Sequence, residues 1–273
     1  MMTEETRREV EFNKSLFEDE EAFTAYFEES MEKDNHRENV YSMEEYPILD
    51  GKKHPFAVIV PGGAYWNVCS FIEGLPYARA LNKEGYSAFI VRYRTKELAH
   101  YPNPQDDLAR AVRELLDRAD ELNLDTDRYS VWGSSAGGHL AASFGTDNMG
   151  YQRYGLKKPQ ALVLCYPVIT MGDLTHPETR VNLLGEGFTE EQIEYCSVER
   201  HVTADYPPTF AFHGLADGAV PYQNSRMLME RLEALGIAHE YHEYPGIEHG
   251  TGLAKGMSCE EWFGCAMHFL RSL

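Results

Sequence analysis

The chain has 273 residues, of which 43% are hydrophobic, and its 44 Asp+Glu against 25 Lys+Arg give a formal net charge of −19. This length suits between one and two domains of roughly 150 residues, with enough apolar residues for one sizeable core. The negative charge repels phosphate backbones and anionic lipid head groups, which argues against binding to nucleic acid or to a membrane surface. We therefore expect a neutral or cationic substrate, unless a locally positive site overrides the field.

The sequence has no run of the roughly 18 to 20 apolar residues that a transmembrane helix needs. Residues 1–10 are charged and lack the apolar stretch of a secretory signal, so we expect a cytoplasmic protein. The five cysteines are an odd number without CxxC spacing. This pattern argues against a disulfide framework and against a zinc site, and predicts reduced, packed thiols.

Residues 1–50 are predicted to form an acidic, helical N-terminal segment. Its apolar residues recur at helical spacing and place a stripe on one face, formed by Phe23, Tyr26, Phe27 and Met31. A stripe this aromatic needs to be buried. It predicts a helix docked on the main domain, and the alternatives of a lid or of the arm of a homo-oligomer stay open.

From residue 52 onward, short apolar runs alternate with segments of helical period. This alternation predicts an α/β fold with a doubly wound, mainly parallel sheet and helices on both faces. The expected strands are 56–60, 87–93, 129–132, 161–166, 209–213 and 239–244. The expected helices between them are 75–84, 106–122, 136–144, 224–235 and 259–273. In such folds ligands bind beyond the carboxyl ends of the strands, so function is expected in the loops there.

Residues 51–273 are thus predicted to form one catalytic domain without internal repeats. One long interruption, residues 171–208, follows an expected strand and contains two short expected helices, at 178–184 and 189–196. An insertion after a strand end is in the right place to roof a site. We therefore interpret it as a cap-like insertion.

A candidate nucleophile follows the expected strand at 129–132. The strand runs directly into a GxSxG sequence centred on Ser135 and flanked by Gly133 and Gly137, at the start of an expected helix. The pattern alone is a weak signal, but a sharp strand-to-helix turn would strain the backbone at the serine and expose its hydroxyl at the sheet edge. The N–H of Ala136, at a helix N-terminus, is then a candidate donor to an oxyanion.

A serine hydroxyl needs a base, and the base needs a residue that orients it. Asp217 follows the expected strand at 209–213, and His249 follows the expected strand at 239–244. The chain order Ser, Asp, His is that of the α/β-hydrolase arrangement, and each member comes just past a strand. These three placements agree independently.

Two glycines after the first expected strand form a candidate oxyanion loop. Pro61-Gly62-Gly63-Ala64-Tyr65 lies where an HGGG-type loop would lie, and glycine lets the backbone turn its N–H groups inward. We expect the N–H groups of Gly63 and Ala64 to point into the site beside that of Ala136. An ordinary tight turn is the alternative for these glycines.

On these residues the chain resembles α/β-hydrolases of the esterase and lipase kind, over residues 52 to about 270. Four stretches resemble bacterial acetyl-xylan and feruloyl-type carbohydrate acetyl esterases, namely residues 61–65, 101–111, 133–140 and 197–209. The resemblance implies a cofactor-free serine hydrolase with Ser135 as nucleophile, His249 as base and Asp217 as its partner. Two departures stand out, because Pro61 replaces the usual His and Ala64 replaces the final Gly.

Further residues are weaker candidates for substrate contacts. Tyr65, Trp66 and Glu73 follow the oxyanion loop and could line the acyl or the leaving-group side, with core packing as the alternative. His213, at a strand end, could lie near the pocket or serve as structural support. A metal is not expected, because the two imidazoles of His239 and His242 would lie on opposite faces of a strand.

The expected activity is that of a serine carboxylesterase that acts on short-acyl esters, acetyl first, through an acyl-enzyme. Small-molecule or oligosaccharide esters are implied as substrates by the resemblance alone. Two alternatives stay open. A small peptidase or amidase, formamidase included, would use the same machinery on a C–N bond, and a non-catalytic binding protein could keep the fold.

Overall fold

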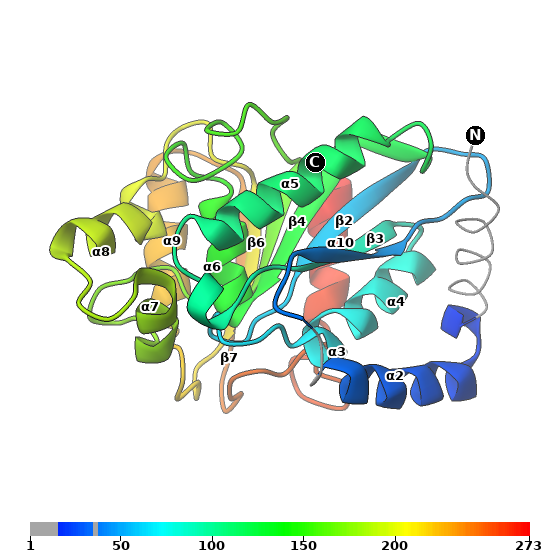
Figure 1. Cartoon of the computed structure of the whole chain (residues 1–273), viewed down its shortest axis with the longest axis horizontal. Coiled ribbons are helices and arrows are strands. Elements are labelled where there is room, and N and C mark those ends of the chain that lie inside the picture. The colour runs from blue at the N-terminus through cyan, green and yellow to red at the C-terminus, as the bar shows by residue number, and fades with distance from the viewer. Residues whose placement is uncertain (1–15, 35–37) are drawn as a thin grey trace.

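The computed structural model of the chain describes residues 16–34 and 38–273, without the side chains of residues 30–34. Within these ranges seven strands form one sheet in the order β1-β3-β2-β4-β5-β6-β7 (Figure 1). The strands are β1 (Ser42–Tyr46), β2 (His54–Val60), β3 (Ser87–Arg92), β4 (Leu124–Ser134), β5 (Ala161–Cys165), β6 (Thr209–Gly214) and β7 (His239–Tyr244). Only the pairing of β1 with β3 is antiparallel, and the five other pairings are parallel.

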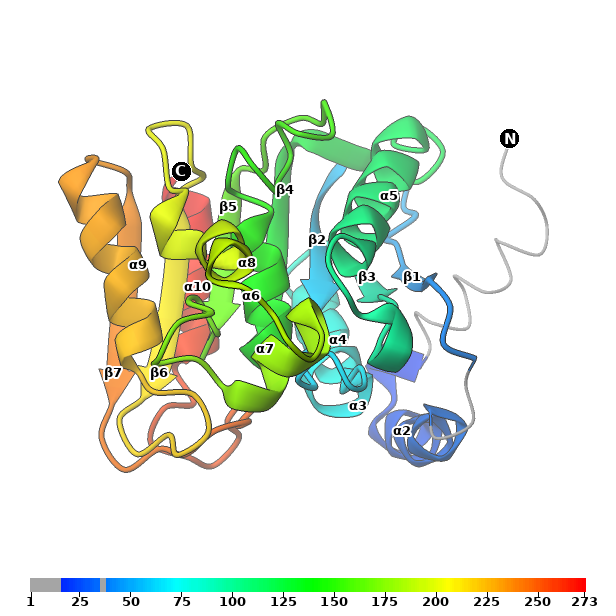
Figure 2. The ribbon, with the colours of Figure 1, turned by 60° about the vertical axis from the view of Figure 1, so that its left-hand side comes forward.

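The sheet is buried on both faces, which explains why its strands are apolar runs. Alternate side chains enter two separate cores: Val58 and Val131 lie in one, and Ile59 and Trp132 lie in the other. The first core is covered by α5 (Asn103–Asp117), α6 (Ser135–Ser143) and α9 (Gln223–Ala234). The second is covered by α4 (Leu75–Lys83) and α10 (Trp262–Ser272), which lie behind the sheet in Figure 2.

The expected fold class is confirmed, and every strand and helix expected after residue 52 is present with ends shifted by a few residues. Short helices complete the chain: α3 (Ser70–Glu73), α7 (Pro177–Leu184), α8 (Glu190–Cys196), and the 3₁₀ turns η1 (Lys96–Leu98) and η2 (Val198–Arg200). Helices α7 and α8 belong to the expected insertion at 171–208. Among the described residues, no helix combines the length and apolarity that crossing a bilayer would require.

The expectation that residues 1–50 are only a helical appendage is wrong. Strand β1 lies in this segment and forms the edge of the main sheet beside β3. Its glutamates pair with cations of the domain: Glu44 binds Arg92, and Glu45 binds Arg118 at 2.6 Å. The sheet therefore begins at Ser42.

Helix α2 (Glu20–Asp34) docks on the second core through part of the predicted stripe. Phe23, Tyr26 and Phe27 are half-buried and pack against that core, and the side chain of Met31 lies outside the described residues. The guanidinium of Arg79 on α4 lies 4.2 Å from the centre of the Phe23 ring and binds Glu20 at the start of the helix. These contacts agree with a docked peripheral helix.

Candidate active site

Ser135 lies at a strained turn between a strand and a helix. Strand β4 ends at Ser134, α6 begins at Ser135, and the φ angle of Ser135 is +54°, in the left-handed region that a residue with a side chain rarely adopts. Neighbouring glycines permit the close approach, because a Cβ on Gly137 would lie 2.1 Å from the carbonyl oxygen of Val60. The turn leaves the Ser135 hydroxyl at the carboxyl edge of the sheet.

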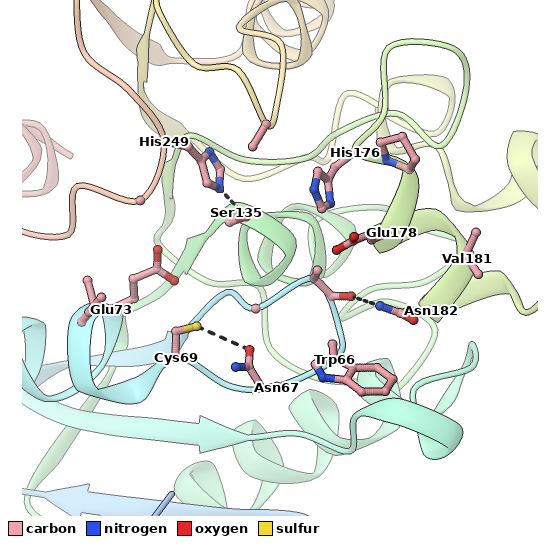
Figure 3. Close-up of a pocket in the computed structure, with 16 residues that line it drawn as sticks. Trp66, Asn67, Cys69, Glu73, Ser135, His176, Glu178, Val181, Asn182 and His249 are labelled. Carbon is pink, nitrogen blue, oxygen red and sulfur yellow. Dashed lines mark hydrogen bonds between the residues drawn. The ribbon is translucent and has the colours of Figure 1, made fainter. Parts of the chain in front are cut away.

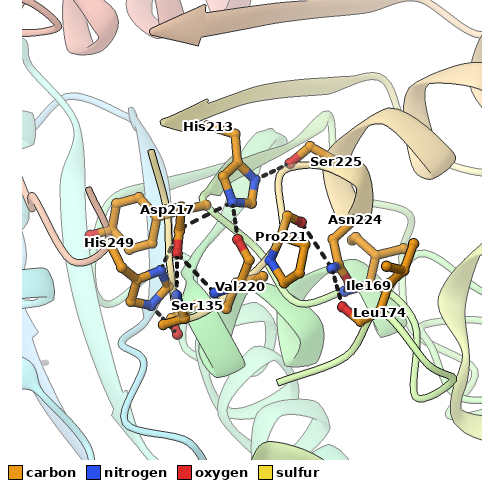
Figure 4. Close-up of polar contacts among 12 residues, drawn as sticks. Ser135, Ile169, Leu174, His213, Asp217, Val220, Pro221, Asn224, Ser225 and His249 are labelled. Atoms are coloured by element: carbon orange, nitrogen blue, oxygen red, sulfur yellow. Dashed lines mark hydrogen bonds and ion pairs between the residues drawn. The ribbon is translucent and has the colours of Figure 1, made fainter. Parts of the chain in front are cut away.

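The structure brings Ser135, His249 and Asp217 together by hydrogen bonds (Figure 4). The Ser135 hydroxyl lies 2.8 Å from Nε2 of His249, and Nδ1 of His249 lies 2.6 Å from Oδ2 of Asp217. A carboxylate only accepts, so Nδ1 of His249 carries the proton and Nε2 is free to accept from Ser135. This is the order of contacts that serine hydrolysis needs.

Asp217 is held in a single orientation. Its side chain is fully buried, and Oδ1 accepts the backbone N–H groups of Ala219 at 2.9 Å and Val220 at 2.8 Å. Burial by itself would raise the pKa of Asp217, but the hydrogen bonds from His213 and His249 outweigh burial and hold that pKa well below its usual range. The group therefore stays a carboxylate.

The loop expected to bind the oxyanion makes a tight turn at Gly63. Gly63 has a φ of +127°, and a Cβ there would lie 2.0 Å from Oδ1 of Asn67, so only glycine fits. The Gly63 carbonyl accepts the N–H groups of Trp66 and Asn67 at 2.8 and 3.0 Å, which closes the turn. Ala64 follows with a φ of +55°, and its carbonyl oxygen accepts a 2.8 Å hydrogen bond from Asn182 of α7. This bond ties the loop to the insertion.

A cavity of about 740 Å³ opens above Ser135 (Figure 3). Gly63, Ala64, Ser135 and His249 lie in its wall, together with Trp66, Asn67, Cys69, Ile72, Glu73, His176, Pro177, Glu178, Val181, Asn182, Ala219 and Gly250. Trp66 is 56% exposed and lies at the rim. The first turns of α7 form the wall beside the loop that carries Gly63 and Ala64. No lysine or arginine is among these described lining residues.

Glu73 links three parts of the site. Its carboxylate accepts the N–H of Gly62 at 2.7 Å and the hydroxyl of Tyr166 at 2.8 Å, and that hydroxyl accepts the N–H of Gly252 at 3.0 Å. The Tyr166 ring packs edge-on against His249 with centroids 4.9 Å apart. Burial raises the pKa of Glu73, because the charged form is poorly solvated there. Glu73 therefore connects the oxyanion loop to the loop that carries His249.

Two candidates for substrate contacts, Tyr65 and His213, do not line the cavity, and for each the structural alternative holds. Tyr65 is fully buried, and its hydroxyl lies 2.9 Å from Nδ1 of His139, so it packs in the core and does not line the cavity. His213 is also fully buried and lies behind Asp217, where it binds Oδ2 of that residue at 3.1 Å. Tyr65 follows β2 and His213 lies near the end of β6, but neither side chain lines the cavity.

Three polar lining residues of α7 and its N-cap were not expected from the sequence: His176, Glu178 and Asn182. The only signal was the position of the insertion after a strand end. Away from the cavity, the described residues contain one group of potential metal ligands, formed by Glu240, His242 and Cys265. Glu240 and His242 are already bonded to each other at 2.7 Å.

A doubly wound sheet with a serine at a strand–helix elbow, an aspartate on the loop after β6 and a histidine on the loop after β7 defines the α/β-hydrolase class. The chain belongs to the BD-FAE family, whose model matches residues 45–232.

Several known proteins are similar to this chain. A solved acetyl ester-xyloside bifunctional hydrolase from Caldicellulosiruptor lactoaceticus is 32% identical with a TM-score of 0.79, and the match covers 88% of this chain and 90% of that one. Endo-1,4-beta-xylanase B from Butyrivibrio fibrisolvens is 30% identical over 84% of this chain and 40% of its own length. An acetylxylan esterase from Xylanibacter ruminicola is 30% identical over 71% of this chain and 40% of its own length. The chain spans 40 to 55% of the length of the curated relatives that it matches.

Proposed function

We propose that the chain is a serine carboxylesterase that hydrolyses short-acyl esters of carbohydrate alcohols, with acetyl esters preferred. The observation that carries this proposal is the pair of hydrogen bonds that joins Ser135 to His249 and His249 to Asp217, at 2.8 and 2.6 Å, at the wall of the cavity. Membership of the BD-FAE family and the names of the similar esterases support the reaction class.

In the first half-reaction, Oγ of Ser135 attacks the ester carbonyl while Nε2 of His249 accepts the hydroxyl proton. Asp217 keeps the proton of Nδ1 in place and stabilises the imidazolium that forms. His249 then gives its new proton to the departing alcohol oxygen, which leaves an acyl group on Ser135. In the second half-reaction, water attacks this acyl-enzyme with His249 again as base, and the free acid leaves.

The negative oxygen of each tetrahedral intermediate would be bound by the N–H groups of Ala136, Gly63 and Ala64. Ala136 is in the first turn of α6, where backbone N–H groups have no partner within the helix. In comparable sites one such donor contributes about 2.7 to 4 kcal/mol to transition-state stabilisation. The strained φ values of Ala64 and Ser135 support this role, because such strain concentrates at functional sites.

Two features support short acyl groups on neutral alcohols. Ala64 carries a methyl group into the cavity wall next to the expected oxyanion position, which narrows that side. The exposed carboxylate in the wall is that of Glu178, and no lysine or arginine is among the described lining residues, so an anionic substrate meets repulsion. The similar proteins named as acetyl ester-xyloside hydrolase and acetylxylan esterase support a carbohydrate alcohol.

The test is hydrolysis of 4-nitrophenyl acetate, butyrate and octanoate, together with acetate release from acetylated xylo-oligosaccharides. We expect kcat/KM to fall with acyl length, acetate to be released from the oligosaccharides, and Ser135→Ala to abolish every activity. Faster cleavage of a formamide or an aminoacyl anilide than of acetate esters would favour the amidase alternative. No turnover of any ester by the purified chain would favour a binding protein and refute the proposal.

A further inference from the structure

His176 occupies the N-cap of α7 and has its tautomer set by that role. Its Nδ1 atom accepts the backbone N–H of Thr179 at 3.4 Å and lies 3.0 Å from the Thr179 hydroxyl. A backbone N–H can only donate, so Nδ1 carries no proton. The proton of the neutral ring is therefore on Nε2. Burial lowers the pKa of His176, which favours this neutral form.

The Nε2 atom faces the cavity without a partner. His176 lines the cavity, and no described residue accepts a hydrogen bond from its Nε2. Figure 3 shows the imidazole of His176 and the carboxylate of Glu178 both turned toward the side of the cavity where Ser135 lies. A donor held by the N-cap contacts and an exposed acceptor thus lie within one turn of the chain.

We propose that His176 and Glu178 form a subsite for the leaving group of the ester, selective for a neutral, polyhydroxylated alcohol such as a sugar. The Nε2–H of His176 donates to a hydroxyl or ring oxygen of the alcohol, and the Glu178 carboxylate accepts from a hydroxyl. This inference rests on the proposed esterase function and adds the residues that recognise its alcohol.

The position of His249 places the leaving alcohol on the side of the cavity where His176 and Glu178 lie. The base that takes the Ser135 proton returns it to the departing alcohol, so the alcohol oxygen must lie next to His249. His176 and His249 line the same cavity. Asn182 of α7 donates a 2.8 Å hydrogen bond to the Ala64 carbonyl, and this bond fixes the position of α7 relative to the oxyanion loop.

The negative charge of Glu178 should make the subsite select neutral leaving groups over anionic ones. Glu178 is exposed on the wall, and Glu73 is buried in it, while the described lining residues offer no lysine or arginine to an anion. A carboxylate on the leaving sugar would approach Glu178 directly. The subsite therefore disfavours a uronate alcohol relative to a neutral sugar of similar shape.

The first experiment compares two acetate esters that share the acyl group, an acetylated methyl xyloside and ethyl acetate. Asparagine is a strong N-cap residue but does not carry the ring donor, so His176→Asn keeps the cap and removes Nε2–H. We expect the ratio of kcat/KM for the xyloside to kcat/KM for ethyl acetate to fall about 2- to 12-fold, as for the loss of one neutral hydrogen bond. Glu178→Ala, at an exposed position, should lower the same ratio and serves as the second variant if His176→Asn does not fold.

The second experiment compares acetylated methyl xyloside with acetylated methyl glucuronoside. Glu178→Gln removes the facing charge, and we expect discrimination against the glucuronoside to weaken by up to about fivefold. Glu186→Gln is the matched control, because Glu186 is exposed in the same insertion but does not line the cavity. It should leave the discrimination at its wild-type value.

The outcomes separate the two proposals. If the wild-type chain cleaves both acetate esters, but neither His176→Asn nor Glu178→Ala changes the xyloside ratio, the subsite is refuted and the esterase function stands. An equal effect of Glu178→Gln and Glu186→Gln on the glucuronoside refutes the charge selectivity. If the wild-type chain cleaves no ester at all, the esterase proposal fails, and the subsite fails with it.

Discussion

Nε2 of His213 lies 3.1 Å from Oδ2 of Asp217, the oxygen that Nδ1 of His249 reaches at 2.6 Å. His213 also lies 3.0 Å from the Val220 carbonyl oxygen through Nε2 and 2.8 Å from the Ser225 hydroxyl through Nδ1. Both neighbours of Nε2 are acceptors, so the proton is on that nitrogen. One carboxylate oxygen thus accepts two imidazole N–H groups, and the second imidazole fixes the carboxylate from behind.

His213→Leu tests this support. The change removes a hydrogen bond to a charged group, whose loss destabilises a protein by about 1.5 to 3 kcal/mol, and leaves the Val220 carbonyl without that donor. We expect the free energy of unfolding in urea to fall by this amount, and kcat to fall with little change in KM, because Asp217 is less well oriented. The control is His242→Leu, a half-exposed histidine whose pairing with Glu240 is worth about 0 to 1 kcal/mol. Equal losses of stability in the two variants would contradict the role of His213.

The lowered pKa of Asp217 should make the stability of the fold decrease at acid pH. Its pKa in the folded state lies below the value of about 3.9 expected when unfolded. Such a group stabilises the fold above the unfolded pKa, and this stabilisation is lost as the pH falls through the folded pKa. The free energy of unfolding should therefore drop more steeply from pH 5 to pH 3 in the wild type than in Asp217→Asn. Parallel curves for the two proteins would show that Asp217 is not held as a carboxylate.

The same substitution should impair turnover far more than stability. An asparagine in place of the orienting aspartate favours the wrong imidazole tautomer, and in a well-studied triad this lowers kcat by about 10⁴-fold. We expect a fall of this order in kcat for 4-nitrophenyl acetate. Urea unfolding checks that the variant is folded under the assay conditions. A loss of tenfold or less in a folded variant would show that Asp217 does not set the tautomer of His249.

For Glu73 we expect the opposite pH dependence of stability from that of Asp217. Burial raises its pKa, so its contribution to stability is present below the unfolded pKa of about 4.3 and is lost as the pH rises through the folded pKa. Glu73→Gln stays neutral at every pH. We expect the variant to gain stability relative to the wild type between pH 5 and pH 8, measured by urea unfolding at both values. A difference between the two proteins that does not change with pH would contradict the buried, proton-binding carboxyl.

The close approach of strand and helix at the elbow can be tested with two alanines. Gly137→Ala would place a Cβ 2.1 Å from the Val60 carbonyl oxygen and 2.4 Å from that of Pro61, so the loop must shift. We expect a loss of about 1 to 3 kcal/mol or more in unfolding free energy, together with loss of activity. Gly264→Ala in α10 meets no atom within 4 Å and should instead stabilise the chain by about 0.5 to 1 kcal/mol. Comparable effects of the two changes would mean that the elbow is not tightly packed.

The sequence predicted the sheet because its central strands are buried on both faces and therefore apolar throughout. It also predicted that Ser135, Asp217 and His249 approach one another, since all three follow parallel strands whose carboxyl ends share one edge. It did not predict β1, because a strand with two adjacent glutamates has no apolar pattern, and its salt bridges to Arg92 and Arg118 form only in the folded chain.

Other parts of the site depend on tertiary packing. Nearness to a strand end does not say which way a side chain points. For that reason the sequence left Tyr65 and His213 open between cavity contacts and interior packing, and both lie in the interior. His176 caps α7 with a ring nitrogen, a role without a sequence signature, and it reaches the cavity only because α7 docks beside the oxyanion loop.

The role of Ser135 as nucleophile is tested by covalent labelling with a fluorophosphonate, with the site of the adduct read by intact mass and by peptide mapping. An activated serine reacts with such a probe, and we expect one adduct per chain, on Ser135. The adduct should be absent from Ser135→Ala and should form much more slowly in Asp217→Asn. An unlabelled wild-type chain, or an adduct on another residue that persists in Ser135→Ala, would show that Ser135 is not the nucleophile.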